Sequence, residues 1–245
     1  MIVDYASVGE TRDDPAWEPL VVTARLSEPI VHYEDGLHLD GPLQWAAWRA
    51  YALEHGDPIG PPPSDWIPDY EIPVARWVGP PAHEGADPRL ATADGKLWGW
   101  CCSDAIGEWV ATSKAEVRKR PAVAEMLRYS KDRTYNSSLG AHKAKDLTFP
   151  TVQAHELTWH VLGAADSMRR LLLRIHSLGK LRGHGHGRVM EWRIEEGCDR
   201  DGWKQRRMPA PKDHSGPTSM ETIRAPYWHR PRQAPCIPRE AQWTT

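Results

Sequence analysis

Four glycines and five Lys, Arg or His residues are interleaved within the ten residues 179–188 (GKLRGHGHGR). Glycine lacks a Cβ, so it allows positive φ and a close approach of another chain. The backbone N–H groups of such a loop, together with its basic side chains, suit a phosphate chain. The residues expected to contact RNA here are Lys180, Arg182, Gly183, His184, Gly185, His186, Gly187 and Arg188. A turn between a helix and a strand needs one glycine, so four favour this contact over a simple flexible turn.

A second basic segment runs from Lys114 to Lys145. It has nine Lys or Arg residues against three Asp or Glu residues, a net charge of +6, whereas the whole chain has a formal net charge of −2. Charge concentrated in this way matters more for contacting phosphates than the overall sum. The alternative is a solvated loop. The residues expected to contact RNA in this segment are Arg118, Lys119, Arg120, Arg128, Lys131, Arg133, His142, Lys143 and Lys145.

The position of the glycine loop excludes a nucleotide cofactor. A dinucleotide-binding G-x-G follows a strand and opens a helix, whereas this loop follows a predicted helix and precedes a predicted strand. The loop has no G-K-[ST], and its histidine pair has no third and fourth metal ligand at a recognisable spacing. None of the four cysteines forms a C-x-x-C pair. The sequence therefore predicts no cofactor and no metal.

General acid–base catalysis by histidine is the catalytic alternative. Histidine is the usual general acid or base, and the candidates among twelve histidines are His38, His184 and His186. Packing, or capping of the following helix beside Asp40, is the favoured explanation of His38. The chain has no nucleophile elbow and no H-E-x-x-H motif. We expect a binding protein without catalytic residues.

Hydrophobic periodicity predicts the elements that position these segments. Apolar residues at helical spacing predict helices over 42–55 and 166–178, with Asp40 and Asp166 or Ser167 as caps and Gly56 and Gly179 just past the ends. β-Branched or alternating stretches predict strands over 20–26, 74–78, 96–102, 108–117, 149–161 and 188–195. The proline-dense stretch 57–88 excludes long regular elements. Turn residues over 129–140 predict a hairpin tip or a disordered loop.

This order of elements predicts an α+β fold with a ferredoxin-like (RRM-like) βαββαβ core. The expected parts are an N-terminal arm over 1–18, the domain over 19–196 and a Pro/Arg/Trp-rich irregular extension over 197–245. The domain contains a large irregular, basic insertion at about 114–148. Thirteen Trp against one Phe suit wet interfaces or base stacking, although a GC-rich genome is an equal explanation.

The N-terminal sequence and the length of the apolar runs indicate where in the cell the protein is expected. The N-terminal residues do not have a basic stretch followed by an apolar one, as a secretory signal would. No apolar run approaches the roughly 20 residues that cross a bilayer. We expect a cytoplasmic protein with reduced thiols and no membrane partner.

A helix, then G-K-x-R-x-x-G-x-G-x-V, then a strand resembles the glycine-rich signature of the CRISPR-associated RAMP superfamily. In that superfamily the loop joins the last helix and last strand of a ferredoxin-like domain and touches guide RNA. The element Leu37-His38-Leu39-Asp40-Gly41 adds a resemblance to the Cas-five-like, 5′-handle-binding subunit of type IV CRISPR effector complexes. The resemblance covers about residues 20–55 and 155–196, and no motif matches the middle or the C-terminal region.

The resemblance implies a non-catalytic subunit that binds the 5′ handle of the guide RNA, caps one end of the complex and contacts its backbone subunit. The implied partners are the CRISPR guide RNA, the backbone and large subunits and, through the complex, target DNA, in antiviral defence. The basic segment lies where such proteins have a protruding hairpin, or thumb. Two alternatives stay open: a guide-RNA endoribonuclease of the same superfamily, and a subunit that binds only other proteins.

Overall fold

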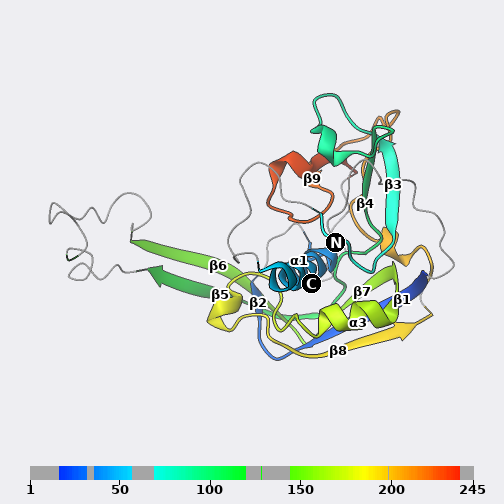
Figure 1. Cartoon of the computed structure of the whole chain (residues 1–245). Coiled ribbons are helices and arrows are strands. Elements are labelled where there is room, and N and C mark those ends of the chain that lie inside the picture. The colour runs from blue at the N-terminus through cyan, green and yellow to red at the C-terminus, as the bar shows by residue number, and fades with distance from the viewer. Residues whose placement is uncertain are drawn as a thin grey trace.

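The computed structural model describes residues 17–31, 36–56, 69–119, 128, 144–197 and 199–237. A compact body holds the helices and most strands, and a two-stranded arm extends far from it (Figure 1). The predicted N-terminal arm, apart from residues 17 and 18, lies outside the described residues. So do five predicted RNA contacts: Arg120, Lys131, Arg133, His142 and Lys143.

An antiparallel sheet with the order β7-β1-β8 forms the centre of the body, from β1 (Glu18–Leu26), β7 (Glu156–Gly163) and β8 (Val189–Glu196). Alternate residues of β1, namely Leu20, Val22 and Ala24, are fully buried, as expected of a strand with one face on a core. The strands predicted over 20–26 and 188–195 are thereby confirmed.

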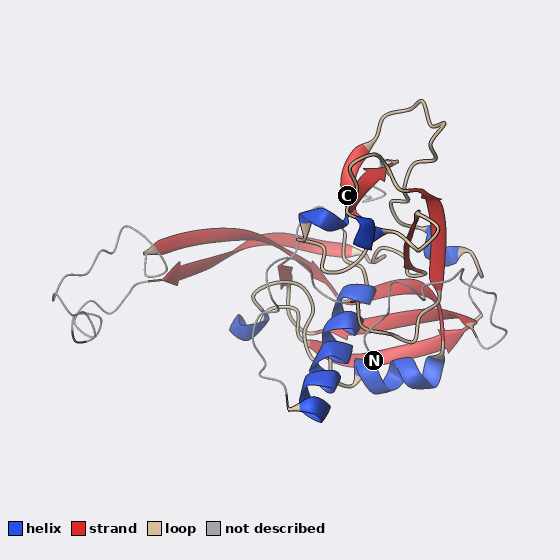
Figure 2. Cartoon of the chain, turned by 45° about the horizontal axis from the view of Figure 1, so that its top comes forward, coloured by secondary structure: helices blue, strands red, loops and turns tan. Residues whose placement is uncertain are grey.

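Helices α1 (Asp40–His55) and α3 (Ala165–Leu172) pack against each other and lie side by side in front of the central strands (Figure 2). Helix α1 ends as predicted at Gly56, whose φ of 67° is left-handed. The predicted cap was wrong: Asp40 is the first helical residue, and no side chain caps the helix.

Helix α3 is shorter than the predicted 166–178. It ends at Leu172 because the next turns tighten, with Arg174 N donating to Leu171 O and Ile175 N to Leu172 O. Ile175 and Leu178 are still buried, so the apolar pattern extends past the helix itself. Neither Asp166 nor Ser167 caps α3, and Gly179 does not end it.

An extended segment over 101–106 runs antiparallel to β7 on the side away from β1. Ile106 and Thr158 exchange two backbone hydrogen bonds of 2.8 Å, and Ser103 N donates to His160 O. Before it, the hairpin of β3 (Arg76–Pro81) and β4 (Lys96–Trp100) places Trp98 and Trp100 in the core. A 3-10 turn, η2 (Pro88–Leu90), lies between these strands. The strands predicted near 74–78 and over 96–102 are confirmed.

The arm consists of β5 (Trp109–Lys119) and β6 (Lys145–Ala154), and β2 (Ile30–Val31) pairs with β6 at its root. The strand predicted over 108–117 is confirmed. The single strand predicted over 149–161 was wrong, since the chain bends at His155 and divides it between the arm and the central sheet. Ala154 and Leu157 are both buried although three residues apart, so an unbroken strand would have to be buried on both faces here.

The C-terminal extension is more regular than predicted. It contains the hairpin of β9 (Ser219–Thr222) and β10 (Gln233–Cys236) and the 3-10 turns η5 (Gly202–Lys204) and η6 (Arg230–Arg232). Arg206, Arg224 and Arg232 of this extension are buried in the body. No helix in the part of the chain described above is long and apolar enough to cross a membrane.

Candidate RNA-binding surface

The base of the glycine loop is hydrogen-bonded to β2 and to the residue that precedes it. Lys180 N donates to Val31 O at 2.7 Å, and Gly187 N donates to Pro29 O at 2.9 Å. Both base glycines have positive φ, 75° at Gly179 and 65° at Gly187. A Cβ at Gly187 would lie 2.0 Å from Leu178 O, and one at Gly179 would lie 2.6 Å from Val31 O. Packing therefore explains these two glycines without any ligand.

The tip of the loop is different. It forms the 3-10 turn η4 (Arg182–His184), and a Cβ at Gly183 or Gly185 would meet no atom within 4 Å. Gly185 has a φ of 90°, but the space around both glycines is open. Only Gly183 and Gly185 therefore leave space for another chain to approach the loop.

The side chains of the loop point largely into solvent. Of the predicted contacts, His186 is half-buried, and the exposed ones are Lys180, Arg182, His184 and Arg188. Partial burial lowers the pKa of Lys180 and of Arg182 from their ordinary values. Arg182 stacks on α1, with its Cζ 5.0 Å from the ring centre of Trp45.

Strand β2 joins the loop to the arm. Val31 pairs with Thr151 of β6 on one side and forms a bridge with Lys180 on the other, so the loop, β2, β6 and β5 lie side by side (Figure 1). The glycine loop thus lies beside the root of the arm, and the basic segment begins there with Lys114, which follows Ser113, the partner of Thr151.

The described part of the arm is less basic than its sequence suggests. Lys114, Arg118 and Lys145 are exposed, and so is Arg128. However, Arg118 lies 3.0 Å from Glu116 and is paired in register with Asp146, so its charge is largely offset. Lys119 is in register with Lys145 at the outer end of the described ribbon. Apart from Lys114, the described basic residues of the two arm strands lie towards the outer end of the arm.

The open face of the central sheet does not provide a second RNA surface of the RNA-recognition-motif type, in which aromatic side chains of the central strands stack on bases. On this face Thr23 hydrogen-bonds Thr158, and Arg193 pairs with Glu156. His160 is covered by Gly202 of η5. None of these strand residues is Trp, Tyr or Phe, and Trp159 and Trp192 pack in the core on the other face.

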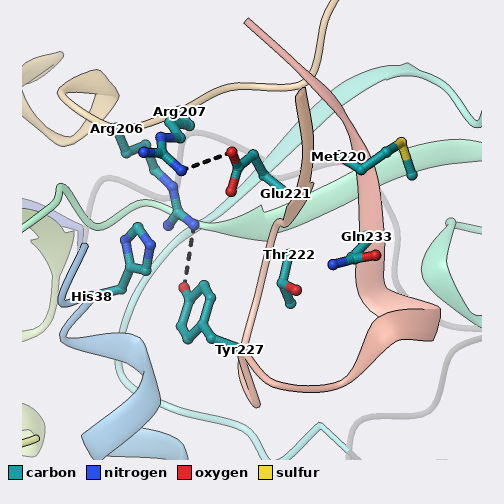
Figure 3. Close-up of a pocket in the computed structure, with 8 residues that line it drawn as sticks. All are labelled: His38, Arg206, Arg207, Met220, Glu221, Thr222, Tyr227 and Gln233. Atoms are coloured by element: carbon teal, nitrogen blue, oxygen red, sulfur yellow. Dashed lines mark hydrogen bonds and ion pairs between the residues drawn. The ribbon is translucent and has the colours of Figure 1, made fainter. Parts of the chain in front are cut away.

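His38 lies in a cavity of about 90 Å³ between the start of α1 and the β9–β10 hairpin (Figure 3). Its Nδ1 is 2.7 Å from Asp104 Oδ1, and its ring stacks on Tyr227 with 4.2 Å between ring centres. The sequence predicted that His38 packs in the fold or caps the helix, and the packing is confirmed. Its partner, however, is Asp104 rather than the neighbouring Asp40.

Asp40 also has a role that its position in the sequence did not indicate. It is fully buried, and the Tyr227 hydroxyl donates to its carboxylate at 2.6 and 2.7 Å. Burial raises the pKa of Tyr227 well above its ordinary value, and Asp40 adds to this against the opposing charge of Arg206. The hydroxyl therefore stays protonated and serves as a donor.

Two residues next to the loop were missed as site residues. Trp45 and Arg49 of α1 contact each other, with Arg49 Cζ 5.7 Å from the indole centre, and Trp45 also carries Arg182. The spacing of four residues on a helix was the available signal. The contact between Trp45 and Arg182 could not be predicted from the sequence.

No cluster of His, Cys, Asp or Glu suited to a metal ion occurs among the described residues.

Comparison with known proteins gives the family. No curated protein matches the chain. A family model for CRISPR type IV associated proteins matches residues 106–237, which is 132 of the 245 residues and includes the arm strands, the glycine loop and the C-terminal hairpin. The match confirms the resemblance to type IV CRISPR proteins. It also extends into the C-terminal region where no motif was recognised, and it does not reach the Leu37–Gly41 element. The chain belongs to the family of CRISPR type IV associated protein Csf3.

Proposed function

We propose that this chain is a non-catalytic subunit of a type IV CRISPR ribonucleoprotein that binds the 5′ handle of the guide RNA. The observation that carries the proposal is the bridge through β2, because it places the basic glycine loop beside the ribbon along which the basic segment 114–145 begins. The tip glycines leave the loop backbone open to a phosphate chain. Family membership supplies the CRISPR context.

The core supports the same assignment. The chain order β1, α1, segment 101–106, β7, α3, β8, with β8, β1, β7 and the segment antiparallel neighbours, is the arrangement of a ferredoxin-like βαββαβ unit whose second strand is irregular. We infer such a core. In it, the glycine loop precedes the last strand, as the superfamily resemblance requires.

Capping one end of the complex and contacting the backbone subunit are assigned to the arm. On one face of the ribbon, Val117 is opposite Leu147 and Ala115 is opposite Phe149. Leu147 is 44 % exposed. A two-stranded ribbon with an apolar stripe is marginal in water by itself, so we expect a neighbouring subunit to cover it.

The test of RNA binding is a filter-binding titration of the full chain with handle RNA at several salt concentrations. The variant Lys180→Ala/Arg182→Ala/Arg188→Ala is compared with Arg169→Ala, which removes an exposed arginine already paired with Asp166 at 2.8 Å. We expect the triple variant to bind about 100-fold more weakly with a shallower salt dependence, and Arg169→Ala to behave as wild type. Unchanged affinity and salt slope in the triple variant contradict the proposal.

A metal-independent endoribonuclease is the second candidate, and the His38–Asp104 pair beside a cavity is the observation that favours it, because a carboxylate orients a catalytic imidazole in this way. Against it, His38 is only 6 % exposed, and Tyr227 is already bonded to Asp40. The Arg206 guanidinium is likewise already used, since it donates to the carbonyls of Trp100 and Cys102.

Incubation of the full chain with precursor repeat RNA in EDTA decides between the binding protein and the endoribonuclease. Cleavage that His38→Ala abolishes establishes the enzyme, and no cleavage eliminates it.

A further inference from the structure

Two guanidinium groups share one indole beside the glycine loop. Arg49, one helical turn after Trp45, places its Cζ 5.7 Å from the ring centre, and Arg182 of the loop places its Cζ 5.0 Å from the same centre. Trp45 itself is half-buried against the hydrophobic core, so the platform is fixed to α1. Two distant segments thus hold two positive charges around one ring.

Neither guanidinium has a carboxylate partner among the described residues. Over the described ranges no ion pair involves Arg49 or Arg182, whereas Arg118, Arg169 and Arg193 each have a carboxylate partner. Each cation–π contact stabilises the arginine's position, but it leaves the charge in place. Like charges on one ring repel each other, and an anion that contacts both would offset this repulsion.

The backbone before Arg182 is strained. Leu181 has a φ of 54° and a ψ of 29°, and this left-handed conformation is unfavourable for a residue with a side chain. Strain of this kind persists where surrounding contacts impose it and is common at binding sites. Here it immediately precedes the residue whose side chain reaches Trp45.

We propose that Arg49 and Arg182 bind one phosphodiester group of the guide RNA between them, and that Trp45 is the positioning residue that holds both. A guanidinium stacked on an indole keeps its N–H edge free, and that edge matches the oxygens of a phosphate with two parallel hydrogen bonds. The inference rests on the proposed function and extends the RNA-binding surface from the loop to α1.

The experiment compares Arg49→Ala, Trp45→Ala and Trp45→Phe with the control Arg169→Ala, using full chain and handle RNA over a range of salt. We expect Arg49→Ala to weaken binding about tenfold and to lower the salt slope by about 0.7, the value for one phosphate of a single strand. Trp45→Ala weakens binding similarly. Trp45→Phe keeps a ring face and restores most of the affinity, which a purely electrostatic loss would not show.

A second arm locates the phosphate. Handle RNAs with one uncharged methylphosphonate linkage at successive positions are bound to wild type and to Arg49→Ala. One position weakens the wild type more than it weakens Arg49→Ala, because the variant has already lost one of the two arginine contacts to that phosphate.

Wild-type affinity and slope in Arg49→Ala overturn the site, and so does the absence of any non-additive position. If Arg49→Ala is unaffected while the Lys180/Arg182/Arg188 variant binds weakly, the site is wrong and the proposed function stands. If the triple variant also binds as wild type, the proposed function is wrong as well. Should Trp45→Ala not fold, Arg49→Ala and Trp45→Phe decide the question.

Discussion

Arginine has opposite roles in the C-terminal extension and in the glycine loop. In the extension, Arg224 is fully buried, donates to the carbonyls of Leu90, Trp98 and Arg89, and lies 3.1 Å from Asp69. In the loop, Arg182 is exposed and stacks on an indole without a carboxylate partner among the described residues. The N–H groups of Arg224 are used by acceptors within the fold, whereas those of Arg182 are available to an anion.

The environment of an arginine, rather than the residue type, decides its role in this chain. Asp69 is fully buried and serves two guanidiniums, those of Arg224 and Arg232, and Arg232 also donates to the carbonyl of Ala225. These contacts fasten the extension to the body. Buried arginines therefore stabilise the fold, whereas exposed, unpaired ones are available to an anion.

The largest expected effect is on stability. Arg224→Met leaves Asp69 and three carbonyls short of a donor in the interior, so we expect the free energy of unfolding to fall by about 3–5 kcal/mol. Urea unfolding measures it. Arg230→Met, at an exposed position of the same extension, is the control and should change stability by less than about 0.5 kcal/mol. If Arg224→Met lowers the free energy of unfolding by less than about 1 kcal/mol, the claim that buried Arg224 stabilises the fold is wrong.

The glycines of the loop also fall into two groups, one required by packing within the fold and one in open space at the tip. Gly187→Ala places a methyl group 2.0 Å from a backbone oxygen at a positive φ, so we expect a loss of about 1–3 kcal/mol in urea unfolding. Gly183→Ala adds a methyl group in open space and should leave stability unchanged. It should lower handle-RNA affinity severalfold in a binding titration if the phosphate chain approaches the tip. Unaltered affinity in Gly183→Ala would show that the tip glycines are not there for close approach.

A moderate effect is expected at the Tyr227 hydroxyl. Tyr227→Phe removes the donor to buried Asp40 and an acceptor for Arg206, whose Nη2 is 3.2 Å away. We expect a loss of about 1–3 kcal/mol on thermal or urea unfolding, with RNA affinity retained in the folded protein. A fall in RNA affinity without loss of stability would instead assign the cavity to RNA.

The smallest effect on the isolated chain is expected from Val117→Ser/Leu147→Ser. These residues are cross-strand partners on the outer ribbon, so stability and the salt slope of RNA binding should barely change. Co-purification with the backbone subunit should fall. If this variant still co-purifies normally with the backbone subunit, the apolar stripe is not the contact surface for that subunit.

Sequence reasoning worked where the signal is local and periodic. It located β1, α1, β4, β5 and β8, and it placed the glycine loop between a helix and a strand. It failed where long-range contacts decide. The bend at His155 depends on which sheet each half joins, and the C-terminal hairpin is held by buried arginines whose pattern resembles that of a solvated tail. The Trp45–Arg182 contact, which links α1 to the loop, is of the same kind.

The most direct test of the central claim is to map where handle RNA touches the full chain. Handle RNA containing 4-thiouridine is cross-linked to the protein, and the attached peptides are identified by mass spectrometry. The account predicts cross-links within residues 179–188, in α1 around Trp45 and at the root of the arm along β2 and β6. Cross-links confined to the open face of the central sheet or to the β9–β10 hairpin would contradict it.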